Sequence, residues 1–414
     1  MQAGLGAGYA DRAGGGVTGA AGSPVLPELR PTPYAIRVED DVLDDLRTRI
    51  RRTRWPDQLP GIGWEQGTEL GYLRELLAYW ADGFDWRARE RELNDFHHYR
   101  AELDGLGIHF VHERGTGRDA VPLVLTHGWP STFLELLPLV PLLTNPAAHG
   151  LDAPAFDVVI PSLPGYGFSD RPARQGMTMP YVAGLWHRLM HGLGYERYGA
   201  VGGDFGAAVS AYLGRDHPGS VIGIHLYTLD VAPYAGPGAR PLTEVEAAYD
   251  AYMETWWRAE GGYKQIQATK PGTVGYGLND SPAGLAAWLI EKWRSWGGCA
   301  GDVERGFSRD FLLSTLTIYW ATQTITSSMR TYYDDRRLGP VGPHDYVGVP
   351  TAVAVFNHMT IPEGVPPREW VERLYAVRRW TEMPRGGHFA ACEEPELLAR
   401  DIGAFFGELC QRRE

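Results

Sequence analysis

Four runs of apolar residues, each ending in a turn, restrict the folds that this chain can adopt. Their sequences are VPLVLTHGWP (121–130), FDVVIPSLPGYGFSD (156–170), YGAVGGDFG (198–206) and SVIGIHLYTLD (220–230). Strands that are apolar along their whole length are buried on both faces, as in parallel sheets covered by helices. Helical segments at 179–193 and 207–216 alternate with these runs. The pattern therefore predicts an α/β protein with a mostly parallel sheet and helices on both faces.

Other strand patterns flank these runs. IHFVHER (108–114) alternates like an edge strand, and VPTAVAVF (349–356) and RRWTEM (378–383) resume the sheet before a closing helix at 395–409. Between about 231 and 343 the strand pattern disappears and segments with helical period, rich in Trp and Tyr, take its place. Most of these aromatic side chains are expected to be core. A helical insertion of this kind is predicted to form a lid over the strand ends, where α/β sheets bind ligands.

The N-terminal part is predicted to be helical. Val42, Leu46 and Ile50 lie four residues apart on one helix face, and a second helical segment covers 68–80. The histidines at 97 and 98 are interpreted as structural or surface residues, because no third ligand lies at helical spacing. Residues 1–30 are rich in small residues and predict a disordered tail. The predicted division is this tail, an N-terminal region (31–105), a first core part (106–230), the lid (231–343) and a second core part (344–414).

Composition limits the possible partners and compartment. The chain of 414 residues has 39 Lys and Arg against 51 Asp and Glu, a net charge of -12, which argues against binding nucleic acid. It contains no run of ~18 apolar residues, so we expect no membrane segment. Its three cysteines match neither a disulfide framework nor a metal site, which favours a cytoplasmic setting and no metal. A homodimer is compatible with the sequence.

The turn around Asp204 carries the strongest chemical signal. Hydrolases with a serine nucleophile place it in the pattern G-x-S-x-G between a strand and a helix. Here Gly202 and Gly206 enclose Asp204 instead. A carboxylate that attacks a saturated carbon forms an ester, which water can cleave in a second step. The residue therefore suits epoxides or alkyl halides as substrates, although an Asp here could also serve only as the N-cap of the following helix.

Two further segments fit the same chemistry. HGWP (127–130) directly follows a predicted buried strand, and the backbone N–H groups of Trp129 and Phe205 could form an oxyanion hole. His388 lies in the glycine-flanked loop RGGH between the last strand and the last helix. A triad histidine occupies this place in the chain order of the serine hydrolases, and its ordinary pKa suits the activation of water. We therefore expect His388 to be catalytic.

These motifs resemble those of the microsomal-type epoxide hydrolases. The similarity rests on RWPD (54–57), HGWP (127–130), PGYGFSD (164–170), GGDFG (202–206), QATKPGTVGYGLNDSPAGLAAW (267–288), SSMRTYY (327–333) and RGGHFAACEEPELL (385–398), and covers nearly the whole chain from residue 31 onward. It implies an α/β-hydrolase fold with a helical lid and an N-terminal helical extension. It also implies hydrolysis of an epoxide to a vicinal diol with water and without a cofactor. The N-terminus lacks the anchor pattern of the animal enzymes, so the chain looks like their soluble bacterial relatives.

The resemblance also implies roles for individual residues. Asp204 corresponds to the nucleophile and His388 to the water-activating histidine. Tyr263 and Tyr332 correspond to two lid tyrosines that donate hydrogen bonds to the epoxide oxygen, although Tyr333 is adjacent to Tyr332.

The acid that orients the histidine departs from the family pattern, since its usual position falls on Met359. Glu363 is then the preferred candidate for this acid and Asp230, beyond an earlier strand, the alternative.

Three readings of function remain at this stage. An epoxide hydrolase is favoured, with a bulky, apolar or aromatic substrate suggested by the aromatic lid and a natural-product epoxide as one option. A haloalkane dehalogenase shares the Asp nucleophile, but enzymes of that kind carry a Trp where this chain has Phe205. A binding protein without catalysis is supported only by Met359.

Overall fold

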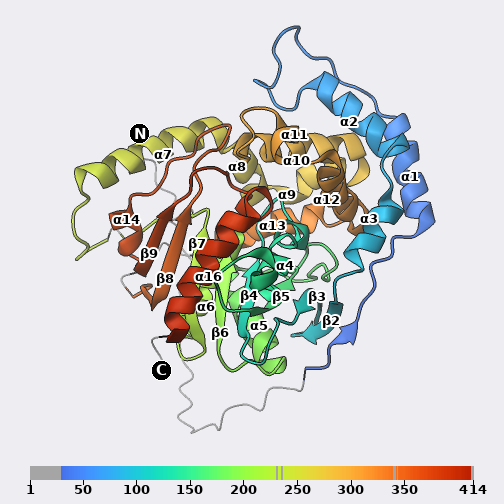
Figure 1. Cartoon of the computed structure of the whole chain (residues 1–414). Helices are drawn as coiled ribbons and strands as arrows, with labels where there is room; N and C mark the ends of the chain where they lie inside the picture. The colour runs from blue at the N-terminus through green and yellow to red at the C-terminus, as the bar shows by residue number, and fades with distance from the viewer. Residues whose placement is uncertain (1–28, 230–231, 235, 339–341, 343, 412–414) are drawn as a thin grey trace, which may run out of the picture.

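A twisted nine-stranded sheet runs through the centre of the computed structural model, which describes residues 29–229, 232–234, 236–338, 342 and 344–411 (Figure 1). Its strand order is β1-β2-β3-β5-β4-β6-β7-β8-β9. The strands are β1 Thr32–Pro33, β2 His98–Leu103, β3 Leu106–Glu113, β4 Val121–Thr126, β5 Phe156–Pro161, β6 Tyr198–Gly202, β7 Val221–Tyr227, β8 Val347–Val355 and β9 Tyr375–Glu382. The predicted tail lies outside the described residues as far as residue 28, and so does Asp230.

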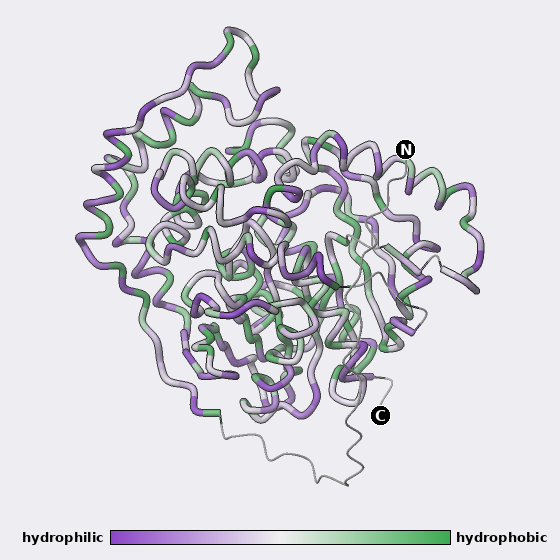
Figure 2. The backbone as a smooth tube through the Cα atoms, turned by 180° about the vertical axis from the view of Figure 1, so that it is seen from behind, coloured by the Kyte–Doolittle hydropathy of each residue, from purple (hydrophilic) through white to green (hydrophobic). Residues whose placement is uncertain are grey.

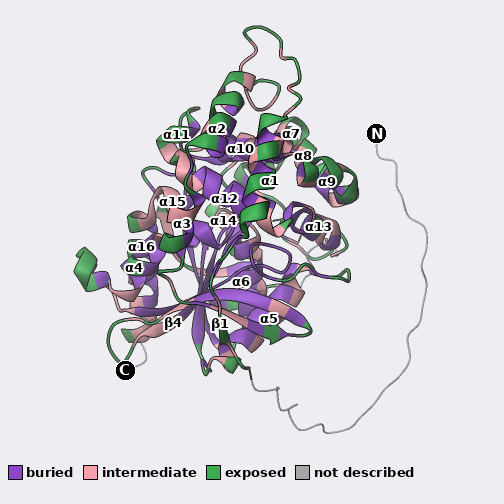
Figure 3. Cartoon of the chain, turned by 90° about the vertical axis from the view of Figure 1, so that its right-hand side faces the viewer, coloured by how far each residue is buried: buried purple, intermediate pink, exposed green. Residues whose placement is uncertain are grey.

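The sheet has a parallel part and an antiparallel part. Neighbouring strands from β5 through β4 and β6 to β9 are parallel, whereas β1, β2, β3 and β5 pair antiparallel. Every residue of β5, β6 and β7 is buried, because helices cover both faces (Figure 3). These helices are α4 Leu139–Thr144 and α16 Pro395–Gln411 on one face, and α5 Met179–Gly192 and α6 Phe205–Asp216 on the other. The predicted fold class is confirmed.

The expected edge strand is not at an edge. β3 contains the segment IHFVHE, but β2 and β5 flank it on both sides and β1 lies outside β2. Strands β2 and β3 form a hairpin whose two-residue loop, Asp104 and Gly105, has positive φ angles of 55° and 74°. An Asp-Gly pair between two alternating runs is the expected sequence for such a turn. The prediction was therefore wrong because the hairpin partner of β3 was overlooked, although this local signal was present.

The N-terminal helices pack on the lid. They are α1 Asp40–Arg51, α2 Leu70–Asp82 and α3 Trp86–Leu93, and they contact α10 and α12 of the lid. The Trp80 indole N–H donates to Thr317 Oγ1 at 2.9 Å, and Arg49 pairs with Asp280 at 2.6 Å. On the predicted helix face, Leu46 and Ile50 are buried, whereas Val42 is only partly buried. The neighbouring Leu43 is buried in its place.

The two neighbouring histidines have different environments. His98 is buried and bonds the Leu93 carbonyl and His109, whereas His97 is exposed and pairs with Glu113. Both therefore have protein partners that account for them, one in the core and one on the surface.

The lid lies above the carboxyl ends of the parallel strands (Figure 1). Helices are its regular elements in the described part of 231–343: α7 Glu244–Glu260, α8 Gly262–Thr269, α9 Pro271–Asp280, α10 Pro282–Trp296, α11 Val303–Gly306, α12 Arg309–Thr322 and α13 Ile325–Asp335. The remaining short helices are η1 Phe133–Leu136, η2 Pro146–His149, α14 Arg368–Glu372 and α15 Ala390–Glu393.

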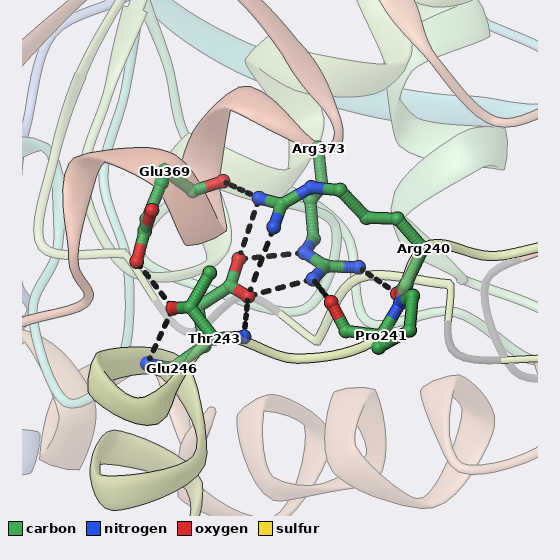
Figure 4. A network of polar contacts seen from close by, with 6 residues as sticks. All are labelled: Arg240, Pro241, Thr243, Glu246, Glu369 and Arg373. Carbon is green, nitrogen blue, oxygen red and sulfur yellow. Dashed lines mark hydrogen bonds and ion pairs between the residues drawn. The ribbon is translucent and has the colours of Figure 1, made fainter.

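The first turn of α7 is tied to the core by ion pairs (Figure 4). The Glu246 carboxylate is buried and accepts from Arg373 Nε and Nη2, both at 2.6 Å, and from Arg240 Nη2 at 2.9 Å. Arg373 follows α14, so these contacts connect the lid to the sheet side of the molecule. We refer to Arg240, Glu246 and Arg373 as the α7 clasp.

Hydropathy follows this arrangement. Hydrophobic residues concentrate in the strands at the centre of the molecule, whereas hydrophilic residues are frequent along the N-terminal helices at its edge (Figure 2). Within the described residues, none of the helices combines the length and the apolar character that crossing a bilayer requires.

Candidate active site

The turn that carries Asp204 has a backbone conformation that side chains other than glycine rarely adopt. Asp204 has φ 52° and ψ -126°, and its amide donates to the Thr228 carbonyl at 3.1 Å. The surroundings must hold it there, since such a conformation costs about 1–3 kcal/mol. Gly206 shows how tight the packing is, because a Cβ at this position would lie 1.8 Å from the Thr126 carbonyl oxygen. The turn is therefore wedged against the end of β4.

The Asp204 carboxylate does not cap the helix. Asp204 occupies the N-cap position of α6, but its side chain makes no capping hydrogen bond there. Instead, Oδ1 accepts from the Trp129 backbone N–H at 2.9 Å. The HGWP loop comes this close because Gly128 lacks a side chain, and a Cβ there would lie 2.4 Å from Asp204 Oδ1. Phe205 begins α6, so its N–H is a first-turn donor without an acceptor inside the helix.

His388 lies beside this carboxylate. Its Nε2 is 3.6 Å from Asp204 Oδ2, its backbone N–H donates to the Trp296 carbonyl at 2.9 Å, and its carbonyl accepts from Thr228 Oγ1 at 3.0 Å. Burial lowers the pKa of His388 to about 3. The imidazole is therefore neutral near pH 7. Two residues far apart in the sequence thus meet at the carboxyl edge of the sheet.

A carboxylate that the sequence analysis overlooked holds the histidine loop. Glu393 Oε2 accepts from the N–H groups of Gly298 at 2.6 Å and Gly387 at 3.1 Å, and Oε1 accepts from Phe389 N–H at 3.0 Å. Two of these donors are the immediate neighbours of His388. Burial raises the pKa of Glu393 to about 7. The residue lies within RGGHFAACEEPE, but no spacing rule marks it, because its role depends on backbone groups.

The two lid tyrosines face the same region from above. Tyr263 in α8 and Tyr332 in α13 have ring centroids 6.0 Å apart and nearly perpendicular rings, and Trp129 stacks on Tyr263 at 5.5 Å. Burial, with Tyr263 and Asp204 nearby, raises the pKa of Tyr332 well above its ordinary value. Its hydroxyl is therefore protonated and can donate. Tyr333 has a different environment, because its hydroxyl accepts from Arg337 Nη2 at 3.0 Å near the surface.

One cavity of about 440 Å³ joins these groups. Asp204, His388, Tyr263 and Tyr332 all line it. The cavity follows one face of α6 from Asp204 past Ala207, Ala208, Ala211 and Tyr212 to Arg215. At 1.5 Å per residue, this face is roughly 16 Å long. The site is therefore one end of an elongated cavity, and three alanines contribute to its wall along α6.

The acid that would orient His388 is not identified by contact. Glu363 lines the main cavity and also a smaller one beside it, which Met359 lines too. The Asp204 carboxylate lies within ion-pair distance of His388, with Oδ2 3.6 Å from Nε2. Asp230 lies outside the described residues. The assignment of the orienting acid to Glu363, with Asp230 as the alternative, therefore stays a prediction.

Two family models and several known proteins match this chain. Residues 31–136 match the family "Epoxide hydrolase N terminus", and residues 121–265 match the family "alpha/beta hydrolase fold". A protein of Stigmatella aurantiaca, itself assigned to the epoxide hydrolases, is 42% identical over 91% of this chain and 85% of its own. Epoxide hydrolase 1 of Sus scrofa is 37% identical over 92% of this chain and 89% of its own.

A solved structure of another protein has a similar fold over nearly the whole chain. The juvenile hormone epoxide hydrolase of the silkworm Bombyx mori superposes with a TM-score of 0.79 at 30% identity, over 93% of this chain and 95% of that one. The similarity therefore extends over the N-terminal region, the core and the lid together.

Proposed function

Since this chain belongs to the epoxide hydrolases, we propose that it converts an epoxide to a vicinal diol through an ester on Asp204. An Asp204 carboxylate oxygen attacks one ring carbon, and the bond from that carbon to the epoxide oxygen breaks. Tyr263 and Tyr332 donate hydrogen bonds to the departing oxygen, which takes a proton from one of them to become the first hydroxyl group and leaves that tyrosine as a tyrosinate. The supporting observation is the shared cavity, which brings Asp204, His388 and both tyrosines to one end.

The second step regenerates the carboxylate. The neutral imidazole of His388 accepts a proton from water, and the hydroxide attacks the ester carbonyl carbon. The N–H groups of Trp129 and Phe205 stabilise the tetrahedral oxyanion, as the hydrogen bond from Trp129 to Asp204 Oδ1 suggests. Collapse of this intermediate breaks the bond between the carbonyl carbon and the diol oxygen, which takes the proton held by His388. The diol leaves, the new Asp204 carboxyl group returns a proton to the tyrosinate, and Asp204 is again a carboxylate.

A covalent trap tests this proposal. With His388→Ala and a small reactive epoxide such as styrene oxide, the ester should accumulate. Mass spectrometry of the digested protein should find the added mass on the peptide that contains Asp204. The double variant Asp204→Ala, His388→Ala is the matched control and should stay unmodified. The absence of any adduct from His388→Ala would contradict the mechanism and favour a relative that only binds its ligand.

The orienting acid is proposed to be Glu363. Glu363→Gln should slow hydrolysis of the ester far more than its formation, because the carboxylate acts through the histidine. Both steps can be followed separately in single turnovers. If Glu363→Gln leaves hydrolysis unchanged while Asp230→Asn cripples it, the acid is Asp230.

The cavity also suggests the kind of substrate. A cavity wall roughly 16 Å long that includes three alanines, with aromatic rings at the reactive end, fits a bulky or extended apolar epoxide. An epoxide from natural-product metabolism would have this character. Ala211→Phe should block the cavity halfway, so activity on a long-chain terminal epoxide should fall at least about 10-fold relative to activity on 1,2-epoxybutane. Equal losses for both substrates would contradict this use of the cavity.

A further inference from the structure

A buried lysine lies behind one of the two lid tyrosines. Lys292 belongs to α10, and only 6% of its surface is exposed. Its Nζ is 4.7 Å from the ring centroid of Tyr263 and 5.5 Å from that of Trp296. Lysine is rarely buried to this degree, and a cation over an aromatic face is attracted by the ring. The ammonium group is therefore part of the aromatic roof of the site.

The charge of this lysine is only partly balanced. It forms an ion pair with the preceding residue, Glu291, whose Oε2 is 2.6 Å from Nζ. The Glu291 side chain is 23% exposed, whereas that of Lys292 is 8% exposed. Water screens the carboxylate more than the ammonium, since charges interact more weakly where solvent surrounds them. The potential that the pair creates at the partly buried ring of Tyr263 is therefore positive.

Lys292 does not itself reach the substrate space. Asp204, Tyr263, Lys264, Asp335 and Glu363 line the cavity, but Lys292 is not among the lining residues. An effect of Lys292 on the reaction must therefore pass through the aromatic rings that separate it from the cavity. Tyr263 is the ring that it approaches most closely, and Trp296 connects the same cluster to His388 at 4.9 Å.

We infer that Lys292 promotes opening of the epoxide by stabilising the negative charge that develops on the Tyr263 hydroxyl as it donates to the departing oxygen. The inference rests on the proposed role of Tyr263. A fixed charge aimed at a developing charge in a water-poor site favours the transition state, because it needs no reorganisation during the reaction. Lys292 is thus a positioning residue that acts on the first step and leaves the second step alone.

The experiment measures the two steps separately in single turnovers with styrene oxide. Lys292→Met keeps the length of the side chain and removes its charge. It should slow formation of the ester about 10–100-fold and change its hydrolysis by less than twofold. Lys292→Arg keeps the charge and should restore most of the rate of ester formation. Lys270→Met removes an exposed lysine of the lid and is the matched control, with both rates unchanged.

Glu291→Gln tests the sign of the electrostatic effect, because it removes a negative charge where Lys292→Met removes a positive one. Removing the balancing carboxylate should leave ester formation as fast as in the wild type or severalfold faster. A slower ester formation in Glu291→Gln would overturn the inference, and this test does not depend on the folding of Lys292→Met. If Lys292→Met and Lys292→Arg each slow ester formation and ester hydrolysis by the same factor, that result would show a purely structural role of Lys292 and would also overturn the inference.

A double-mutant cycle separates this inference from the proposed function. If Lys292 acts through Tyr263, Lys292→Met should have little further effect on ester formation in a Tyr263→Phe background. If Tyr263→Phe slows ester formation but Lys292→Met does not, the inference fails while the proposed function stands. If Tyr263→Phe itself leaves ester formation unchanged, the proposed role of Tyr263 fails and the inference fails with it.

Discussion

The floor and the roof of the cavity are built in different ways. The floor depends on backbone geometry: Asp204 sits at a positive φ, Trp129 presents an N–H, and His388 is fixed by hydrogen bonds on both sides of its peptide. The roof depends on packed rings, with Tyr263 and Tyr332 held by their aromatic neighbours. Substitutions in the floor should therefore change both chemistry and stability, whereas loss of a roof hydroxyl should change chemistry alone.

The largest effect is expected at Asp204. Asp204→Ala and Asp204→Gly should each lose at least about 10⁴-fold in kcat/KM, since both remove the nucleophile. They should differ in stability, because glycine adopts a positive φ without strain and alanine does not. Urea denaturation should show the Gly variant to be about 1–2 kcal/mol more stable than the Ala variant. An Ala variant as stable as the Gly variant would mean that the turn is not strained.

The roof should respond more weakly and without loss of stability. Tyr263→Phe and Tyr332→Phe should each lower the rate of ester formation about 10²-fold, because one donor to the departing oxygen is lost. Melting temperatures should stay within about 2–3 °C of the wild type, because the rings keep their packing. A melting temperature that falls with the rate would show that the hydroxyls also hold the roof together.

Glu393 tests how firmly the histidine loop is held. Burial raises its pKa to about 7 from an ordinary value of 4.5, so the folded protein binds a proton that the unfolded chain releases between these pH values. Its contribution to stability is therefore complete below about pH 4.5 and is lost as the pH rises toward 7. Glu393→Gln removes this titration, so its free energy of unfolding should fall less than that of the wild type between pH 5 and 7. The same fall in both proteins would contradict the burial of this carboxyl group.

The α7 clasp should give the smallest effect on catalysis. Hydrogen bonding to Arg373 is the main cause that lowers the pKa of Glu246 to about 2, so its stabilising contribution is present above pH 4.5 and is lost as the pH falls toward 2. Glu246→Gln should lower the free energy of unfolding by about 2–4 kcal/mol at pH 7, because the buried Arg373 guanidinium group loses its partner. The rate on styrene oxide should change little. Glu244→Gln, at an exposed position of the same turn, is the control.

Local patterns predicted the parts of the fold that local sequence determines. The four apolar runs predicted strands β4 to β7. The glycines around Asp204 predicted the strand-turn-helix unit that carries this residue. The hairpin partner of β3 was missed, because β2 looks polar until its pairing is known. Glu393 and Lys292 were also missed, because one acts through backbone N–H groups and the other through burial behind a ring. Neither role leaves a motif, whereas a nucleophile in a glycine turn does.

The central claim is that an Asp204 oxygen ends in the first diol that the enzyme releases. One turnover in H₂¹⁸O, with enzyme in excess over epoxide, tests it directly. The account predicts an unlabelled diol after that turnover and ¹⁸O in the carboxyl group of Asp204. A labelled diol together with an unlabelled Asp204 peptide would mean that water attacks the epoxide directly, and would contradict the account.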